Sequence, residues 1–411
     1  MSLVEEGYER ALASLRSNAT ELGFSASPER HVNYFSVWSR DHSICALAAI
    51  TTEDETLIRV AKRGILALLR RQTENGQVPS YIEIEGRRKV MGGLGAITSV
   101  DSNLWVIIAA AQIYRQTKDR RLISDANIER YRALGRLLKA FDSNDCGLIE
   151  VHVAGDWADI FNRYYHVLYD EALYYQALKS LAYLYEEKAE RTKTMDPALL
   201  RRRAKRLRKD AARTKRKINR TFWFTPETIE RVREEYMIIN EIEGSFKYYM
   251  GHIMPFKMYW EHHFESFGNT LAILTDVADD TKRDSIINYV FENSIDQPCP
   301  LTAMSPPVFP NEVSWQFIYA EREKPYEYHN GGIWPMIAGF WIKALVKAGR
   351  HDDARKQLER LASVLAQQDW QFHEYLHGKT LEPMGRTNQA WSAAGYILAY
   401  HAVTKHVQLF P

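Results

Sequence analysis

The stretch that decides the fold is DSNLWVIIAAAQIYRQ, residues 101–116, which is apolar or small-sided on most of its helical faces. A helix of this composition must be covered on all sides. The segments before and after it, 54–72 and 124–141, have apolar residues at three- and four-residue spacing with charges between them. We therefore expect one buried helix between two helices that each face water on one side.

The same alternation continues along the whole chain. Amphipathic segments lie at 3–22, 54–72, 124–141, 196–220, 280–293 and 351–368, and apolar or small-sided segments lie at 38–50, 101–116, 166–187, 266–277, 331–347 and 388–403. Strand-like alternation is confined to short pieces such as 78–85. The pattern predicts an all-α protein, an (α/α)6 barrel of six helical hairpins in a ring, forming a single domain over residues 1–411. An open helical-repeat array is disfavoured, because no sequence repeat recurs at constant period.

Composition limits the partners of such a protein. The chain has 54 basic and 52 acidic residues, and a net charge of +2 gives no general attraction to nucleic acid or to an acidic membrane. The longest apolar stretch, 104–111, is far shorter than the roughly 20 residues that span a bilayer. Cys45, Cys146 and Cys299 lack the spacing of a disulfide framework or a zinc site, and the N-terminus lacks a signal-peptide core. We expect a cytoplasmic protein with a small ligand, compatible with a homo-oligomer.

In a ring of hairpins, the loops that lead from outer into inner helices all emerge at one end. Aromatic, carboxyl and amide residues gather at these entrances: Trp38, Arg40, Asp41, Gln77, Asp101, Trp157, Asp159, His329, Trp334, Glu374, Gln389 and Trp391. Singly they have ordinary interpretations, such as a helix N-cap for Asp101 or a core position for Trp391. Together they suit a sugar, whose apolar faces stack on aromatic rings and whose hydroxyls need donors and acceptors.

Six runs at these entrances resemble a known family. In order they are WSRD (38–41), GQVP (76–79), VDSNLW (100–105), FGN (267–269), YHNGGIWP (328–335) and QAWSAAGY (389–396). The chain resembles the (α/α)6-barrel glycoside hydrolases over residues 35–396, above all the neutral/alkaline invertases (glycoside hydrolase family 100). It also has kinship to the amylo-α-1,6-glucosidases and to the mannosylglycerate and glucosylglycerate hydrolases.

The resemblance implies roles for particular residues. Trp157-Ala-Asp159 is similar to the run that carries the family's general acid, which gives Asp159 that role with Asp156 as the fallback. The run from Trp370 to Tyr375 resembles the one with the general base, which gives Glu374. The other ten residues named at the entrances would line the sugar subsite. The family inverts the anomeric carbon, which implies carboxyl groups about 6.5–9.5 Å apart, and it requires no cofactor or metal.

One departure from the family concerns the substrate. Invertases carry an Asp-Arg-Arg-Met-Gly run at the acid position, whereas this chain has Asp159-Ile-Phe-Asn-Arg163. Sucrose specificity therefore does not follow from the resemblance, although hydrolysis of a small α-glycoside, such as sucrose or a glucosyl or mannosyl conjugate, still does.

Other interpretations of the same residues compete with hydrolysis. His373-Glu-Tyr-Leu-His377 has the H-E-x-x-H pattern of zinc proteases, but Gly378 follows at once and the extended pattern with a third His is absent. The remaining candidates for a third ligand are Glu382, His401 and His406. A sugar epimerase or isomerase using His329 and His373, or a non-catalytic sugar-binding barrel, would fit the same fold.

Two further segments invite a binding function. Twelve basic residues lie between Arg201 and Arg220, over an apolar stripe that favours a solvated outer helix rather than a nucleic-acid patch. The segment from Asp142 to Gly147 has the composition of an Asx-rich turn, with calcium binding between Asp142 and Cys146 as the alternative.

Overall fold

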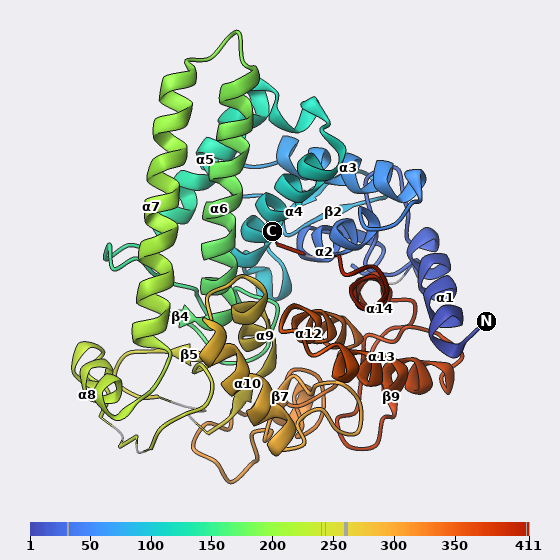
Figure 1. Ribbon diagram of the computed structural model, residues 1–411, viewed down its shortest axis with the longest axis vertical. Helices are drawn as coiled ribbons and strands as arrows, with labels where there is room; N and C mark the ends of the chain where they lie inside the picture. Colours follow the sequence, from blue (N-terminus) through green and yellow to red (C-terminus); the bar gives the residue numbers. More distant parts are fainter. Residues whose placement is uncertain (31–32, 240, 243, 259–261, 408, 411) are drawn as a thin grey trace.

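The computed structural model describes residues 1–30, 33–239, 241, 242, 244–258, 262–407, 409 and 410 (Figure 1). The outer helices are α1 (Leu3–Ser17), α3 (Glu55–Arg70), α5 (Asp125–Phe141), α7 (Pro197–Thr221), α10 (Asp280–Glu292) and α13 (His351–Ala366). The inner helices are α2 (Ser39–Ala49), α4 (Val100–Thr117), α6 (Leu168–Arg191), α9 (Ser266–Leu274), α12 (Pro335–Lys347) and α14 (Ala390–Lys405). Each lies within a few residues of its predicted position.

The inner helices form a closed ring. Each packs against the next in the order α2, α4, α6, α9, α12 and α14, and α14 returns to α2. Outer helices cover this ring, with α3 against α2 and α4, α7 against α6, and α13 against α12 and α14. Every residue of α2 and of α9 is buried, as expected for helices that are apolar on most faces. The fold is therefore an (α/α)6 barrel, which confirms the prediction.

The two kinds of helix also begin differently. Among the outer helices, α1, α3, α5, α7 and α10 start at a Ser or Asp whose side chain accepts a backbone N–H of the first turn. By contrast, the inner helices α2, α4, α6, α12 and α14 start without a side-chain cap. In α2, α4, α6 and α14, the first N–H donates instead to a backbone carbonyl of another segment. The positive ends of these helix dipoles lie at one end of the barrel.

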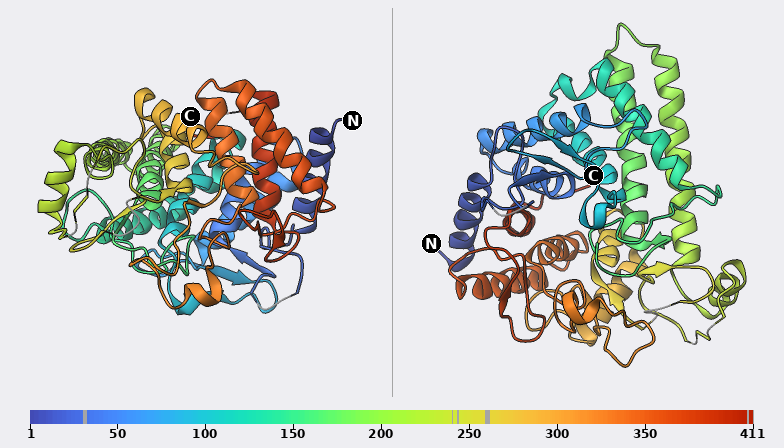
Figure 2. Two further views of the ribbon diagram at one scale, coloured as in Figure 1. Left: turned by 90° about the horizontal axis from the view of Figure 1, so that it is seen from below. Right: turned by 180° about the vertical axis from the view of Figure 1, so that it is seen from behind.

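Short strands anchor the loops at that end. The strands β1 (Ser36–Trp38), β2 (Tyr81–Glu83) and β3 (Lys89–Val90) form an antiparallel sheet in which Trp38 pairs with Tyr81. Three two-stranded pairs join β4 (His166–Val167) to β5 (His252–Ile253), β6 (Phe264–Glu265) to β7 (Met304–Ser305), and β8 (Tyr375–Leu376) to β9 (Pro383–Met384). Because β1, β4 and β6 run directly into α2, α6 and α9, they fix the entrances to the ring. In the left view of Figure 2, the strands lie on the opposite side from the C-terminus.

Smaller elements complete the chain. They are the helices α8 (Pro226–Glu235) and α11 (Tyr319–Arg322) and the 3-10 turns η1 (Leu94–Ala96) and η2 (Arg120–Ile123). The strand-like piece predicted at 78–85 forms a strand only over Tyr81–Glu83. None of the helices in the described ranges has the length and apolar character needed to traverse a lipid bilayer.

Candidate active site

A cavity of about 720 Å³ opens among the entrances to the inner helices. Ten of the twelve predicted site residues line it: Trp38, Arg40, Asp41, Trp157, Asp159, His329, Trp334, Glu374, Gln389 and Trp391. They come from the starts of α2, α12 and α14 and from the loops before α6 and β8. The barrel thus brings together residues that lie more than 300 positions apart in the sequence.

The other two predicted residues, Gln77 and Asp101, do not line the cavity. The Gln77 amide bridges loops by donating to the carbonyl oxygens of Val78 and Ser99, at 3.1 and 3.3 Å. Asp101 is fully buried and accepts two hydrogen bonds from the Arg40 guanidinium, at 2.6 and 3.0 Å. It is not the N-cap of α4, a position that Ser99 occupies. Asp101 therefore holds Arg40 in place from behind the cavity wall.

Aromatic side chains form much of the cavity wall. Trp334 stacks on His329 with ring centroids 5.4 Å apart and on Tyr375 at the same separation. Trp157 meets Trp334 edge-on at 5.5 Å. His329 Nδ1 lies 2.7 Å from the buried Glu323 carboxylate, and burial holds the pKa of His329 well below its usual value. The wall is consequently rigid and presents a neutral imidazole at neutral pH.

Glu374 is fixed at the entrance to the β8–β9 pair. Its carboxylate accepts hydrogen bonds from the Arg386 backbone N–H and the Tyr34 hydroxyl, each at 3.2 Å. Gly385 has a φ of +72°, and a Cβ there would lie 2.5 Å from Glu374 Oε2, so only glycine fits. Burial raises the pKa of Glu374 to about 7 against these hydrogen bonds, and the charges of Asp41 and Asp159 raise it further.

Asp159 faces the same cavity from the loop before α6. Burial raises the pKa of its carboxyl to about 7, opposed by the charge of Arg40 and reinforced by Asp156 and Asp101. Asp156, the fallback for the acid, is instead engaged: it accepts from Arg163 Nε at 2.8 Å and from the Ala158 N–H at 2.7 Å. Asp159 is thus the better placed of the two to exchange a proton with a ligand.

Several residues around the cavity were not singled out from the sequence. Tyr34, Tyr328 and Gly385 line it, and Glu323 supports His329 from behind. Tyr34 lies in the aromatic run that opens the first inner helix, and Tyr328 begins one of the six family runs. Glu323 and Gly385 have no comparable pattern, because their roles depend on contacts that the fold creates.

A further carboxyl lies deeper, in the first turn of α6. Asp170 is fully buried, and neither of its oxygens has a hydrogen-bond partner among the described residues. Burial raises the pKa of Asp170 well above its usual value, and Asp156 and Asp101 add to the effect. The position therefore favours the protonated form of the Asp170 carboxyl.

We predict that Asp170→Asn is tolerated and changes how stability depends on pH. With its pKa raised in the folded state, Asp170 lowers stability progressively as the pH rises above about 4, by up to about 1.4 kcal/mol per pH unit. Asn cannot ionise, so the variant should lack that decline. Thermal unfolding of both proteins from pH 4 upward measures the difference, and parallel curves would contradict a protonated Asp170.

The H-E-x-x-H run lacks the helical geometry of a zinc-protease site. A zinc protease needs its two histidines one helical turn apart, whereas Tyr375–Leu376 between them is the strand β8. His377 Nδ1 accepts the backbone N–H groups of Lys379 and Thr380, at 3.3 and 3.2 Å. Within the described ranges, no three His, Cys, Asp or Glu side chains are grouped as metal ligands would be. His373 does not line the cavity either, so the two histidines of the epimerase alternative are not brought together there.

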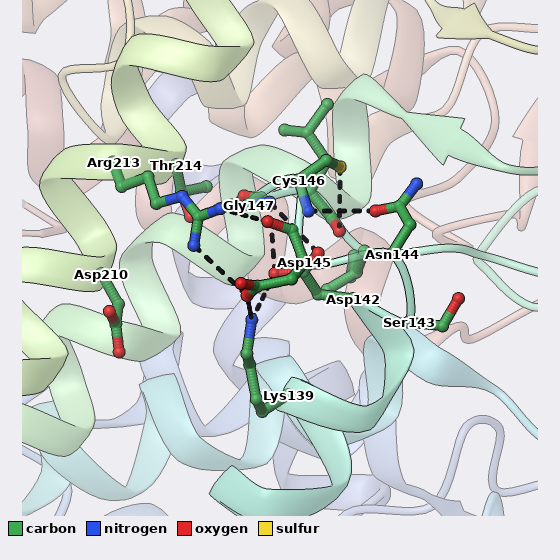
Figure 3. Close-up of polar contacts among 12 residues, drawn as sticks. Lys139, Asp142, Ser143, Asn144, Asp145, Cys146, Gly147, Asp210, Arg213 and Thr214 are labelled. Carbon is green, nitrogen blue, oxygen red and sulfur yellow. Dashed lines mark hydrogen bonds and ion pairs between the residues drawn. The ribbon is translucent and has the colours of Figure 1, made fainter.

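The Asx-rich turn between α5 and α6 already has its charges neutralised, as Figure 3 shows. Lys139 Nζ lies 2.7 Å from Asp142 and 2.5 Å from Asp145. Asp145 also pairs with Arg213 at 3.3 Å, and Asp142 accepts the Gly147 N–H at 3.1 Å. Because the carboxylates of Asp142 and Asp145 are already paired with basic side chains, the segment is better explained as a structural turn than as a calcium site.

Solved structures that share this fold include several glycosidases. A GH63 mannosylglycerate hydrolase from Thermus thermophilus matches at a TM-score of 0.63 and 14% identity, covering 95% of this chain and 99% of that one. A bacterial glucoamylase in complex with acarbose matches at 0.61 and 14%, covering 98% and 56%. The protein thus shares the (α/α)6-barrel fold of these glycosidases.

Sequence comparison gives the family within this class. The chain belongs to the alkaline and neutral invertase family, whose model matches residues 6–406. The probable alkaline/neutral invertase D of Arabidopsis thaliana is 22% identical over 446 aligned residues, covering 96% of this chain and 80% of the relative. The mitochondrial neutral/alkaline invertase 1 of Oryza sativa subsp. japonica is 30% identical over 156, covering 36% and 24%. The family predicted from the entrance residues is thereby confirmed.

Proposed function

We propose that this glycoside hydrolase cleaves a small α-glycoside with inversion, with Asp159 as the general acid and Glu374 as the general base. One observation carries the proposal: both carboxyls line a single cavity, and burial raises the pKa of each to about 7. Inverting hydrolysis needs one protonated and one ionised carboxyl at the working pH. Because the negative charge of Asp159 raises the pKa of Glu374, the pair favours holding one proton near neutrality.

The surroundings favour one assignment of that proton. Glu374 accepts two hydrogen bonds, which stabilise its ionised form. At Asp159, burial and the negative charges of Asp156 and Asp101 outweigh the positive charge of Arg40, so its protonated form is favoured. Asp159 would then donate its proton to the glycosidic oxygen as the bond to the anomeric carbon breaks. Glu374 would take a proton from the water that attacks the opposite face of the sugar. The free sugar leaves with inverted configuration and the alcohol leaves protonated.

The remaining lining residues would hold the sugar. Trp157, Trp334 and Trp391 supply aromatic surface for its apolar faces. Arg40 and Asp41 supply a donor and an acceptor for neighbouring hydroxyls, and Asp101 keeps the Arg40 guanidinium oriented. Gln389, at the start of α14, adds an amide that can both donate and accept hydrogen bonds.

A substrate panel tests the proposal. Purified protein would be incubated with sucrose, trehalose, maltose, isomaltose, glucosylglycerate and mannosylglycerate, and the anomer of the first-released hexose read by NMR. We expect hydrolysis of at least one of these α-glycosides with release of the β anomer. Release of the hexose solely as the retained α anomer would refute inversion, and no hydrolysis of any α-glycoside would refute the substrate class.

The proposal also covers the cellular location and the domain organisation of the enzyme. We propose that residues 1–411 act as one catalytic domain in the cytoplasm, where its three cysteines, all free in the structure, would stay reduced. Relatives with similar sequences carry cytosolic, mitochondrial and chloroplastic names. Cell fractionation with an antibody to the protein tests the location.

A further inference from the structure

A second concave site lies on the outside of the barrel and is lined by residues of α6, α7 and the start of α10. The long helices α6 and α7 lie side by side in Figure 1. It is a groove of about 570 Å³. The charged residues that line it are Lys179, Arg208, Lys215, Arg216, Lys282 and Asp279. Five cations and one anion therefore face the same space, although the chain as a whole has a net charge of only +2.

Ion pairs within the protein neutralise only part of this charge. Arg208 Nε lies 2.7 Å from Glu186, and Lys282 Nζ lies 2.7 Å from Asp279. Within the described part of the chain, the other three cations, Lys179, Lys215 and Arg216, have no ion pair. Such cations in one groove raise the local positive potential and favour an anionic ligand.

Lys179 is the most constrained of the three. It projects from the inner helix α6, is half-buried, and lies over the Tyr175 ring with its ammonium 5.1 Å from the ring centroid. Burial lowers the pKa of Lys179, and the charges of Lys347, Lys215 and Arg208 lower it further. The nearest carboxylate influence comes from Asp276, which Lys347 already binds at 2.7 Å. Exposed cations are expected on α7, because it is a solvated outer helix. They are not expected on the inner helix α6, where Lys179 is half-buried beside them.

We propose that this groove binds an organic phosphate that carries at least two negative charges. Lysine and arginine side chains are the usual ligands of phosphate oxygens, and Lys179, Lys215 and Arg216, which have no ion pair among the described residues, line this groove. Ala211, Ala212 and Val277 form an apolar part of the same wall that would contact the organic portion. The volume lies in the range of small-molecule sites. A concave site with converging charges fits a small anion better than the long straight backbone of duplex DNA.

The test measures binding of inorganic pyrophosphate by calorimetry at near-physiological salt, with sulfate for comparison. We expect pyrophosphate to bind more tightly than sulfate, and Lys179→Met and Lys215→Gln each to weaken it by about tenfold. The control is Lys205→Gln, which removes the same charge from the exposed face of α7 and should leave affinity unchanged. Asp279→Asn should strengthen binding, because it removes the carboxylate that lines the groove and can still cap α10.

Several outcomes would overturn the site. They are undetectable pyrophosphate binding, equal weakening by Lys205→Gln and Lys215→Gln, or binding of duplex DNA that pyrophosphate does not displace, which would indicate a nucleic-acid surface instead. If Lys179→Met fails to fold, the other two variants still test the site, because Lys215→Gln should weaken pyrophosphate binding and Asp279→Asn should strengthen it. None of these measurements depends on the hydrolytic activity.

Discussion

Glu374→Gln is expected to lower turnover by about 10²- to 10⁴-fold on every α-glycoside that the protein hydrolyses. The amide keeps the shape of the side chain and can still accept the Arg386 N–H, but it cannot take a proton from the attacking water. Since water must be activated whatever the leaving group, the loss should be similar for good and poor leaving groups. Steady-state kinetics on two substrates with different leaving groups measure this.

The same substitution should leave the protein at least as stable as before. With its pKa raised to about 7, ionisable Glu374 lowers stability between about pH 4 and pH 7, and Gln removes that effect. Glu382→Gln, an exposed position in the same β8–β9 segment, is the matched control and should retain full activity. Turnover within a few-fold of wild type in Glu374→Gln, with normal thermal unfolding, would exclude Glu374 as the base.

The helices could be predicted from the sequence because each kind of helix has its own composition. The inner helices are apolar or small on most faces, and α2 and α9 are indeed buried throughout. The strict alternation of outer and inner helices along the chain predicted a ring of hairpins. A ring of hairpins in turn predicted which loops lie together at one end. The helices α8 and α11 were not predicted, because they lie in connections between ring helices, outside the alternation of outer and inner segments.

The sequence allowed us to predict which loops form the site, but not which way their side chains point. Gln77 and Asp101 lie at the predicted entrances, yet their side chains turn to neighbouring loops and to Arg40 instead of the cavity. Tyr34 contacts Glu374 across 340 positions of sequence, so no local pattern could have revealed the pair. The direction of a polar side chain in a loop depends on the packing around it. The spacing of residues along the sequence does not contain that information.

Asp159→Asn is expected to produce a loss that depends on the leaving group, which distinguishes an acid from every other role. On an ordinary glycoside the leaving oxygen needs a proton, and we expect turnover to fall by about 10²- to 10⁴-fold. On the corresponding α-glycosyl fluoride the leaving fluoride needs little protonation, so the loss should be much smaller. The ratio of the two losses, measured with the same sugar, is the decisive quantity.

The pH profile provides a second readout on the same variant. Wild-type turnover should decline above about pH 7 as Asp159 ionises, and below it as Glu374 becomes protonated. In Asp159→Asn, the decline at high pH should disappear on the fluoride while the decline at low pH remains. Asp156→Asn is the contrasting variant: it breaks the buried pair with Arg163, so it should lower thermal stability and slow both substrates alike. Equal losses on glycoside and fluoride in Asp159→Asn, with the high-pH decline unchanged, would show that another group donates the proton.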